Sequence, residues 1–228
     1  MWGLSLLKNA LVPAGRKPRR IKFGLYKDIA LDLYLRSQTQ MLWGLWERET
    51  YAFVRAAGAN ARWLVDIGAG SGEMSLYFLR RSGRIAVIAC EPSAGEVEAF
   101  RHHLVLNGFS PDACRIVNHC VGTGEDAVRL ADLVRPLEGP GFIKIDVDGA
   151  EMDVLDSAAD TLDKRDVAML IETHSAELET DCIAWLRQRG FATAVLDNAW
   201  WRRILPDGRV IAHNRWLAAR RSRRPDPV

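Results

Sequence analysis

The sequence predicts an α/β fold in which helices cover both faces of a mostly parallel β-sheet. Five short apolar segments have the composition of buried strands, and amphipathic helical segments separate them along the chain. Strands that are apolar over their whole length are typical of parallel sheets, because such sheets are buried on both faces. Near the C-terminus this alternation breaks, which indicates that the last strand runs in the opposite direction.

The elements of the predicted sheet begin at residue 62. Strands are expected at residues 62–68, 84–91, 114–121, 141–147 and 167–172. Helices are expected at residues 73–81, 94–107, 125–136, 152–162 and 176–189, where apolar residues recur at helical spacing. Ser93 followed by Glu96 forms a capping-box signal at the start of the second helix.

The C-terminal part contains one more strand at residues 191–197 and then a Pro-Asp-Gly turn at residues 206–208. Since no crossover helix follows the turn, we expect the final strand to return antiparallel. Residues 1–60 are expected to form a mostly helical cap over the ligand-binding edge of the sheet. Residues 61–220 are the expected main domain, and residues 221–228 an expected disordered basic tail.

Composition excludes several classes of protein. The chain has 228 residues, of which 48% are hydrophobic and 26% charged, as in an ordinary globular domain. Its formal net charge of +2 gives no strong overall attraction to nucleic acid or to an anionic membrane. Basic residues do cluster at 16–22 and 215–224, where a solvated tail and a phosphate-contacting arm are both open interpretations.

The cysteines and the N-terminus predict a cytoplasmic protein. The four cysteines contain no CxxC pair, so buried thiols in a reducing compartment are expected, and a zinc site is not. The apolar stretch at residues 1–15 is shorter than the roughly 20 residues that span a bilayer. It also lacks the basic start and the cleavage site of a secretory signal.

The segment LVDIGAGSGEM, residues 64–74, predicts a ligand site at the end of the first strand. Gly68 and Gly70 permit a tight turn that a ligand can approach closely, and Gly72 lies where the following helix begins. The G-x-G-x-G spacing differs from the G-x-G-x-x-G of dinucleotide-binding proteins. Asp66, directly before the turn, would repel a phosphate and attract a cation.

Glu91 ends the second strand, 19 residues after Gly72. A carboxylate in this place can accept hydrogen bonds from both hydroxyls of a ribose. A ligand with a ribose, a positive charge and no phosphate fits both acids, and S-adenosylmethionine has these features. The alternative is a glycine turn that serves only packing.

Five segments, in order, carry a resemblance to a known family: LVDIGAGSGEMS, IACEPS, LNGF, FIKIDVDGAEMDVLDSA and LIETH. They resemble class I S-adenosylmethionine-dependent methyltransferases, and more narrowly the FkbM family, over about residues 60–220. The members of that family are mostly assigned as O-methyltransferases of sugars and natural products. Gly70 and Asp148 depart from the pattern, since the family usually has Asn and Glu there.

The resemblance implies a Rossmann-like, seven-stranded sheet of order 3-2-1-4-5-7-6 with the seventh strand antiparallel. It also implies a cofactor site, to which we assign Asp66, Gly68, Ala69, Gly70, Gly72, Glu91, Pro92 and Asp146.

Polar residues after the fourth and fifth strands are the candidates for catalysis. An acceptor hydroxyl needs a group that draws its proton away, and the imidazole of His174 has a suitable pKa. Asp146 is the second candidate, and Glu172 the third, although Glu172 can instead pair with Lys144. Asp148 and Glu151 can likewise form a capping pair at a helix start.

No metal is expected, but Asp146, Glu172 and His174 offer oxygen and imidazole ligands that would suit Mg²⁺ or Mn²⁺. The expected acceptor is a small molecule with a hydroxyl group, without nucleic-acid or membrane partners. Trp43, Trp46, Trp200 and Trp201 form a sugar-stacking wall in one interpretation and fill the core in the other.

Two other functions stay open. The basic ends would suit an RNA methyltransferase, although the chain has Asp146-Val147-Asp148-Gly149 where base amino-group methyltransferases carry a Pro-Pro-aromatic segment. Pro-Cys, the nucleophile dipeptide of cytosine-C5 enzymes, does not occur. A non-catalytic scaffold with a cofactor fold is the second alternative.

Overall fold

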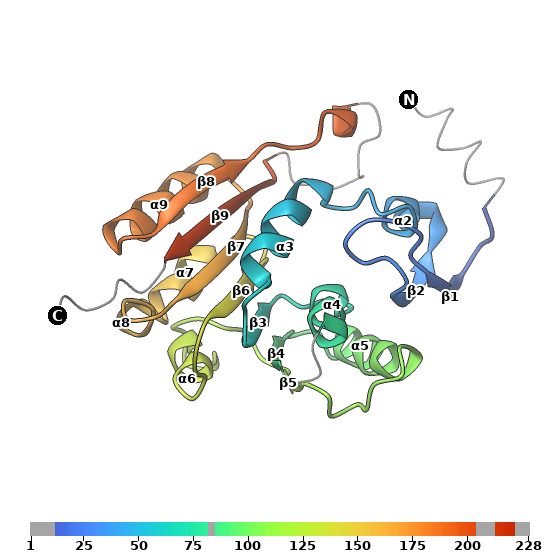
Figure 1. Ribbon diagram of the computed structural model, residues 1–228, viewed down its shortest axis with the longest axis horizontal. Coiled ribbons are helices and arrows are strands. Elements are labelled where there is room, and N and C mark those ends of the chain that lie inside the picture. The colour runs from blue at the N-terminus through green and yellow to red at the C-terminus, as the bar shows by residue number, and fades with distance from the viewer. Residues whose placement is uncertain (1–11, 82–84, 204–212, 222–228) are drawn as a thin grey trace.

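The computed structural model describes residues 12–81, 85–203 and 213–221 (Figure 1). A seven-stranded sheet forms the centre, with the strand order β5-β4-β3-β6-β7-β9-β8. The bounds of its strands are β3 Trp63–Ile67, β4 Ala86–Cys90, β5 Arg115–Val117, β6 Gly141–Ile145, β7 Val167–Thr173, β8 Ala192–Leu196 and β9 Arg215–Arg221.

Neighbouring strands from β5 to β7 are parallel, whereas β9 is antiparallel to both β7 and β8. Counted from β3, the order is 3-2-1-4-5-7-6. The predicted Rossmann-like methyltransferase fold is therefore confirmed, including the reversed last strand. The Pro-Asp-Gly turn lies outside the described residues, as do residues 222–228 of the basic tail.

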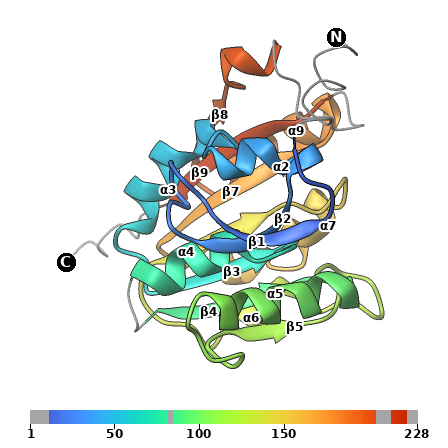
Figure 2. The ribbon, with the colours of Figure 1, turned by 90° about the vertical axis from the view of Figure 1, so that its right-hand side faces the viewer.

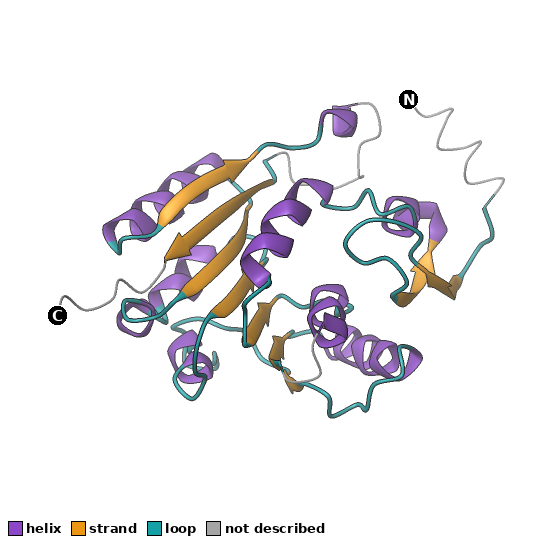
Figure 3. Cartoon of the chain, viewed as in Figure 1, coloured by secondary structure: helices purple, strands orange, loops and turns teal. Residues whose placement is uncertain are grey.

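Helices pack on both faces of the sheet, as Figures 1 and 3 show. One layer consists of α3 Tyr51–Gly58, α4 Glu73–Arg81 and α5 Ala94–Leu106, and the other of α6 Leu130–Val134, α7 Glu151–Asp156, α8 Ala159–Leu162 and α9 Ala176–Gln188. Successive strand residues alternate between the two layers: Leu64 and Phe142 pack toward α4, and Val65 and Ile143 toward α6 and α7. This alternation explains why the strands are apolar throughout.

The N-terminal segment differs from the predicted helical cap. It contains α2 Leu35–Leu42 and a short 3₁₀ turn, Arg48–Thr50, but also an antiparallel hairpin of β1 Arg16–Arg20 and β2 Ala30–Tyr34 (Figure 2). The basic RKPRR of β1 is an exposed strand with a proline and no apolar alternation, so its sequence carries no strand signal. Residues 1–11 lie outside the described part.

Helix α5 holds this hairpin in place. The Asn107 side chain accepts a hydrogen bond from Ala30 N and donates one to Ala30 O, and Asp32 N donates to His103 Nε2. Leu31 alternates with Asp32 and is buried in the core. The cap is thus anchored on the α4–α5 side of the sheet.

Several elements are shorter than predicted. The predicted strand 114–121 is reduced to β5, and the helix 125–136 to α6. The helix expected over 152–162 divides into α7 and α8 at Ser157, whose buried hydroxyl donates to Val154 O and accepts from Leu130 N. A side chain that bonds backbone groups in this way competes with helix continuation.

The four cysteines are free thiols; Cys90, Cys114 and Cys182 are buried as expected, whereas Cys120 is exposed. Among the helices in the described residues, none has the length and hydrophobicity that a bilayer crossing needs.

Candidate active site

A cavity of about 450 Å³ opens at the carboxyl ends of the central strands. Open parallel sheets bind their ligands at this edge. Its walls come from the turn after β3, the ends of β4, β6 and β7, the N-terminal segment and the residue before β9. They are formed by Trp46, Glu47, Gly68, Ala69, Gly70, Glu73, Glu91, Lys144, Asp146, Asp148, Glu172, His174 and Asn214.

The three glycines of the first turn serve different purposes. Gly68 has φ +70°, and a Cβ there would lie 1.8 Å from the carbonyl oxygen of Asp146, so β3 and β6 touch through their backbones. A Cβ at Gly72 would lie 1.9 Å from the Phe100 ring, so this glycine allows α4 to approach α5. Gly70, with φ +49°, has open space beside it and lines the cavity. Gly68 and Gly72 therefore allow close packing, and Gly70 leaves the turn open to the cavity.

Glu91 is held against this turn. Its Oε2 accepts a hydrogen bond of 2.9 Å from Gly70 N, and its Oε1 accepts one of 2.9 Å from Ser93 N. Its backbone carbonyl and that of Pro92 accept from the Asn118 amide. A carboxylate oxygen has two acceptor sites, and each oxygen of Glu91 uses one of them for these backbone hydrogen bonds.

Asp66 lies beneath the cavity wall and is fully buried. Its Oδ2 accepts a hydrogen bond from the Ser75 hydroxyl at 2.7 Å, and its Oδ1 is 3.7 Å from Lys144 Nζ. Burial raises the pKa of Asp66, and the charge of Lys144 and the Ser75 hydrogen bond counteract part of this rise. The acid before the turn is thus balanced inside the protein and is not among the described residues that line the cavity, and its assignment to the cofactor site stays a prediction.

Lys144 connects the first turn to the end of β6. Its ammonium donates to Gly68 O at 2.7 Å and lies 3.3 Å from Asp146 Oδ2. Burial lowers the pKa of Lys144, but the carboxylates of Asp146 and Asp66 raise it by more, so it stays charged. The predicted pairing of Lys144 with Glu172 is wrong, because Asp66 and Asp146 are its partners.

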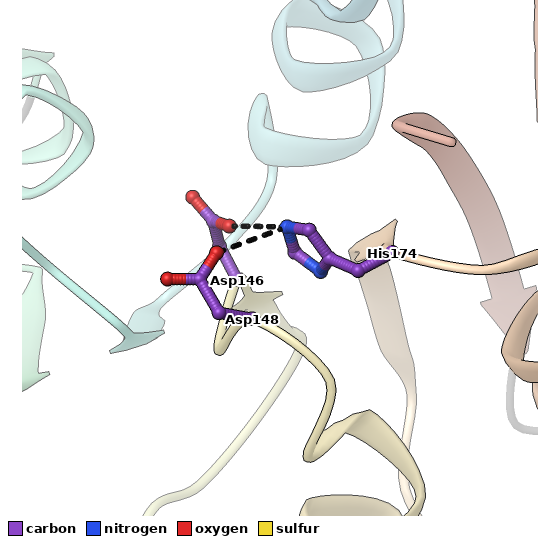
Figure 4. A group of neighbouring side chains, drawn as sticks. All are labelled: Asp146, Asp148 and His174. Carbon is purple, nitrogen blue, oxygen red and sulfur yellow. Dashed lines mark ion pairs between the residues drawn. The ribbon is translucent and has the colours of Figure 1, made fainter. Parts of the chain in front are cut away.

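His174 follows β7, and its side chain is almost buried (Figure 4). Its Nδ1 is 2.5 Å from Glu151 Oε1. Its Nε2 is 3.2 Å from Asp148, 3.8 Å from Asp146 and 4.0 Å from Glu172. Burial lowers the pKa of His174, but the hydrogen bond and charge of Glu151 and the charges of Asp146 and Asp148 raise it by more, so the net shift is upward.

Glu151 fixes the orientation of this imidazole. The residue is fully buried at the start of α7, and its Oε1 also accepts a hydrogen bond from Gly149 N at 3.0 Å. When Glu151 accepts from Nδ1–H, the Nε2 atom is left as the acceptor on the side of the cavity. The residue before α7, Ala150, provides no side-chain cap, so the predicted capping pair of Asp148 and Glu151 is wrong.

Asp146 belongs to two clusters of polar side chains. The first cluster also contains Asp148 and His174, and the second also contains Glu47 and Glu172. Within each cluster, one oxygen or nitrogen atom of each side chain lies within 4.8 Å of those of the others. Burial raises the pKa of Asp146, but Lys144, a hydrogen bond with Glu172 and the charge of His174 lower it by more. The three predicted catalytic residues therefore share one wall of the cavity.

Of the predicted cofactor-binding residues, Gly68, Ala69, Gly70, Glu91 and Asp146 line the cavity, whereas Asp66, Gly72 and Pro92 are not among its lining residues. Sequence reasoning missed Glu47, Glu73 and Asn214. A positive φ of 49° at Glu47, which brings its carboxylate into the cavity, has no sequence signal outside glycine. Lys144 did have a signal, because a lysine within a buried strand is rare.

Of the tryptophans proposed as a sugar-stacking wall, Trp46 lines the cavity. Trp43 is half exposed and stacks on Phe23, and Trp200 is largely exposed. The side chain of Trp201 lies outside the described part.

Residues 123–193, which include the Asp146–Glu151 turn and His174, match the family model "Methyltransferase FkbM domain". The resemblance to the FkbM family is confirmed. The matched region contains the cavity residues Asp146, Asp148, Glu172 and His174, while the glycine turn and Glu91 precede it. No curated protein matches the chain in sequence.

Solved structures share the fold. A SAM-dependent O-methyltransferase from Thermotoga maritima has 13% identity and a TM-score of 0.54, with 97% of this chain and 83% of that chain covered. A precorrin-6y C5,15-methyltransferase from Geobacter metallireducens has 14% identity and a TM-score of 0.52, with 76% and 88% covered. A ribosomal protein L11 methylase from Lactobacillus delbrueckii has 15% identity and a TM-score of 0.51, with 77% of each chain covered.

These structures carry the names of three different methyltransferases, and the two acceptors that are named, precorrin-6y and ribosomal protein L11, are chemically unrelated. Their similarity to this chain therefore concerns the class I methyltransferase fold alone. Together with the FkbM match, it supports S-adenosylmethionine-dependent methyl transfer as the activity.

Proposed function

We propose that this protein transfers a methyl group from S-adenosylmethionine to a hydroxyl group of a small molecule, a sugar or another natural product. One observation carries the proposal: the carboxylate of Glu91 and the imidazole of His174 line the same cavity. A donor bound at one side and a hydroxyl held at the other would meet inside it.

The donor side suits the cofactor chemically. Gly68, Ala69 and Gly70 would hold it through their backbone, and Glu91 would accept from the ribose hydroxyls with the acceptor sites that its two backbone hydrogen bonds leave free. When bound, the cofactor supplies an electrophilic methyl group. The protein's task is then to align an oxygen with it and to exclude water.

The acceptor side supplies a base. His174 Nε2 takes the hydroxyl proton as the oxygen attacks, and Glu151 holds the ring through Nδ1 and stabilises the imidazolium that forms. Asp146 orients the hydroxyl, since its carboxylate is fixed by Lys144 beside the turn that holds the donor.

Incubation of the protein with radiolabelled S-adenosylmethionine and fractions of a cell extract tests this function. The expected product is a small molecule that carries label in an alkali-stable linkage, as a methyl ether does. Label that alkali releases would indicate a carboxyl ester, and label in nuclease-sensitive material would indicate an RNA methyltransferase; either result would overturn the proposal. Absence of any labelled product together with weak donor binding would favour a non-catalytic scaffold.

A further inference from the structure

Acidic side chains outnumber basic ones among the described residues that line the cavity. These residues include six carboxyl groups and one lysine, together with His174: the acids are Glu47, Glu73, Glu91, Asp146, Asp148 and Glu172. Lys144 is already paired with Asp146 and with Asp66 behind the wall. An anionic acceptor, such as a phosphorylated or carboxylated sugar, would be repelled by this wall.

Glu47 adds an acid where two others already meet. Its carboxylate oxygen lies within 4.8 Å of those of Asp146 and Glu172, and its backbone adopts a positive φ to place it there. Three carboxylates that lie this close to one another repel each other. A bound cation would reduce this repulsion.

Asn214, on the same cavity, provides an independent observation. Its side chain is nine-tenths buried, and its Oδ1 has no hydrogen-bond partner among the described residues. A buried amide oxygen without a partner is destabilising, so a ligand that donates a hydrogen bond here is bound more tightly. Trp46 offers an apolar ring surface to the same cavity.

We propose that the acceptor carries an ammonium group next to its hydroxyl groups, as an amino sugar does, and that Glu47, Glu172 and Asn214 bind this ammonium. The hydroxyl that receives the methyl group faces His174. This inference rests on the proposed function, and it names the class of acceptor. The same carboxyl groups would also attract a divalent metal ion, so the test must separate the two cations.

Calorimetric titration of the protein saturated with S-adenosylhomocysteine tests the inference. The probes are matched methyl glycosides that carry an ammonium, a hydroxyl or a carboxylate at one position, in the gluco, galacto and manno series. We expect the ammonium member of at least one series to bind about tenfold or more tightly than its neutral partner, as a hydrogen bond to a charged group provides. The carboxylate members should show no binding.

Glu47→Gln should remove most of this tenfold preference and leave the affinity for the neutral glycoside unchanged. Glu98→Gln, an equal loss of charge on the exposed side of α5, is the matched control and should leave the preference intact. If Glu47→Gln does not fold, a salt titration replaces it. Added NaCl should lower the affinity for the ammonium glycoside and leave the affinity for its neutral partner unchanged.

Three results would overturn the inference. They are equal binding of the neutral and ammonium members, no binding of any ammonium member, and a preference that survives Glu47→Gln. Binding of Mg²⁺ or Mn²⁺ alone that Glu47→Gln abolishes would assign the acids to a metal instead. If S-adenosylhomocysteine itself does not bind, the proposed function fails as well. If it binds and the glycosides give one of the three contradicting results, only the proposed acceptor class is wrong.

Discussion

At the scale of single residues, His174 has two distinct sides. Nδ1 faces the buried carboxylate of Glu151, and Nε2 faces the cavity and the carboxylates of Asp146 and Asp148. The contact with Glu151 determines which ring nitrogen carries the proton of the neutral imidazole. The carboxylates near Nε2 determine how strongly the ring binds a second proton. Both follow from positions after β6 and β7 that the sheet brings together.

Replacement of His174 by alanine is expected to lower kcat by about 10²–10⁴-fold, the usual contribution of a general base. The donor affinity should stay within about twofold, because His174 lies on the acceptor side of the cavity. Single-turnover assays and calorimetry with S-adenosylhomocysteine measure the two effects. His102→Ala, on the exposed side of α5, is the control. Unchanged turnover in the His174 variant would remove the imidazole from the mechanism.

The upward pKa shift of His174 predicts the pH dependence of turnover. A base must be deprotonated, so kcat should rise with pH through a midpoint above the ordinary histidine pKa of about 6.5. Glu151→Gln removes the largest charge that raises this pKa, so the midpoint should move to lower pH. Asp148→Asn should move it in the same direction by less, because Asp148 is largely exposed. A midpoint that Glu151→Gln leaves in place would show that another group titrates.

Glu91→Ala should weaken S-adenosylhomocysteine binding more than tenfold. Two diol hydrogen bonds to a carboxylate are lost, at a cost of about 1.5–3 kcal/mol. The variant also frees Gly70 N and Ser93 N, so its thermal midpoint must be measured beside its affinity. A folded variant whose affinity changes less than threefold would show that Glu91 does not hold the diol.

At the scale of elements, the turn between β3 and α4 joins strand packing to ligand access. Gly68→Ala places a Cβ against the Asp146 carbonyl as well as in the left-handed region, so we expect it to destabilise the fold by more than about 2 kcal/mol. Gly70→Ala meets only the conformational penalty, about 1–2 kcal/mol. Urea denaturation of the two variants without ligand measures the difference. Equal losses would contradict the close contact of β3 with β6.

The sequence predicted the elements whose patterns are local. The continuous apolar runs, the Ser93 cap and the amphipathic α9 all appear as expected, because burial and capping depend on neighbouring residues. The β1 strand was missed, since an exposed basic strand has no apolar period. The division of α7 from α8 was missed because it depends on a hydrogen bond that Ser157 accepts from Leu130 N, which is far away in sequence.

The candidate site was predictable only in part, for the same reason. Strand ends identified Glu91, Asp146, Glu172 and His174 without any structure. The partner of Lys144 could not be predicted, because it depends on which neighbouring strand ends turn toward it. Glu47 comes from a segment more than ninety residues before Asp146 and meets it only through the packing of the cap.

At the scale of the whole molecule, donor binding should stabilise the entire domain. A ligand at 100 times its Kd adds about 2.7 kcal/mol to the free energy of unfolding. For a chain of this length that corresponds to a rise in Tm of roughly 5–10 °C. We expect S-adenosylmethionine and S-adenosylhomocysteine to give this shift in a thermal scan, and NADH to give none. A larger shift with NADH would identify the cavity as a dinucleotide site.

The position of β9 has a consequence for how the protein is made. The strand occupies the place between β7 and β8, although it comes last of all the strands. During synthesis, β8 therefore has no neighbour to pair with until residues 215–221 leave the ribosome. A premature stop a dozen residues before Arg221 would leave two unpaired strand edges, and such nascent chains would be targets for chaperones and proteases.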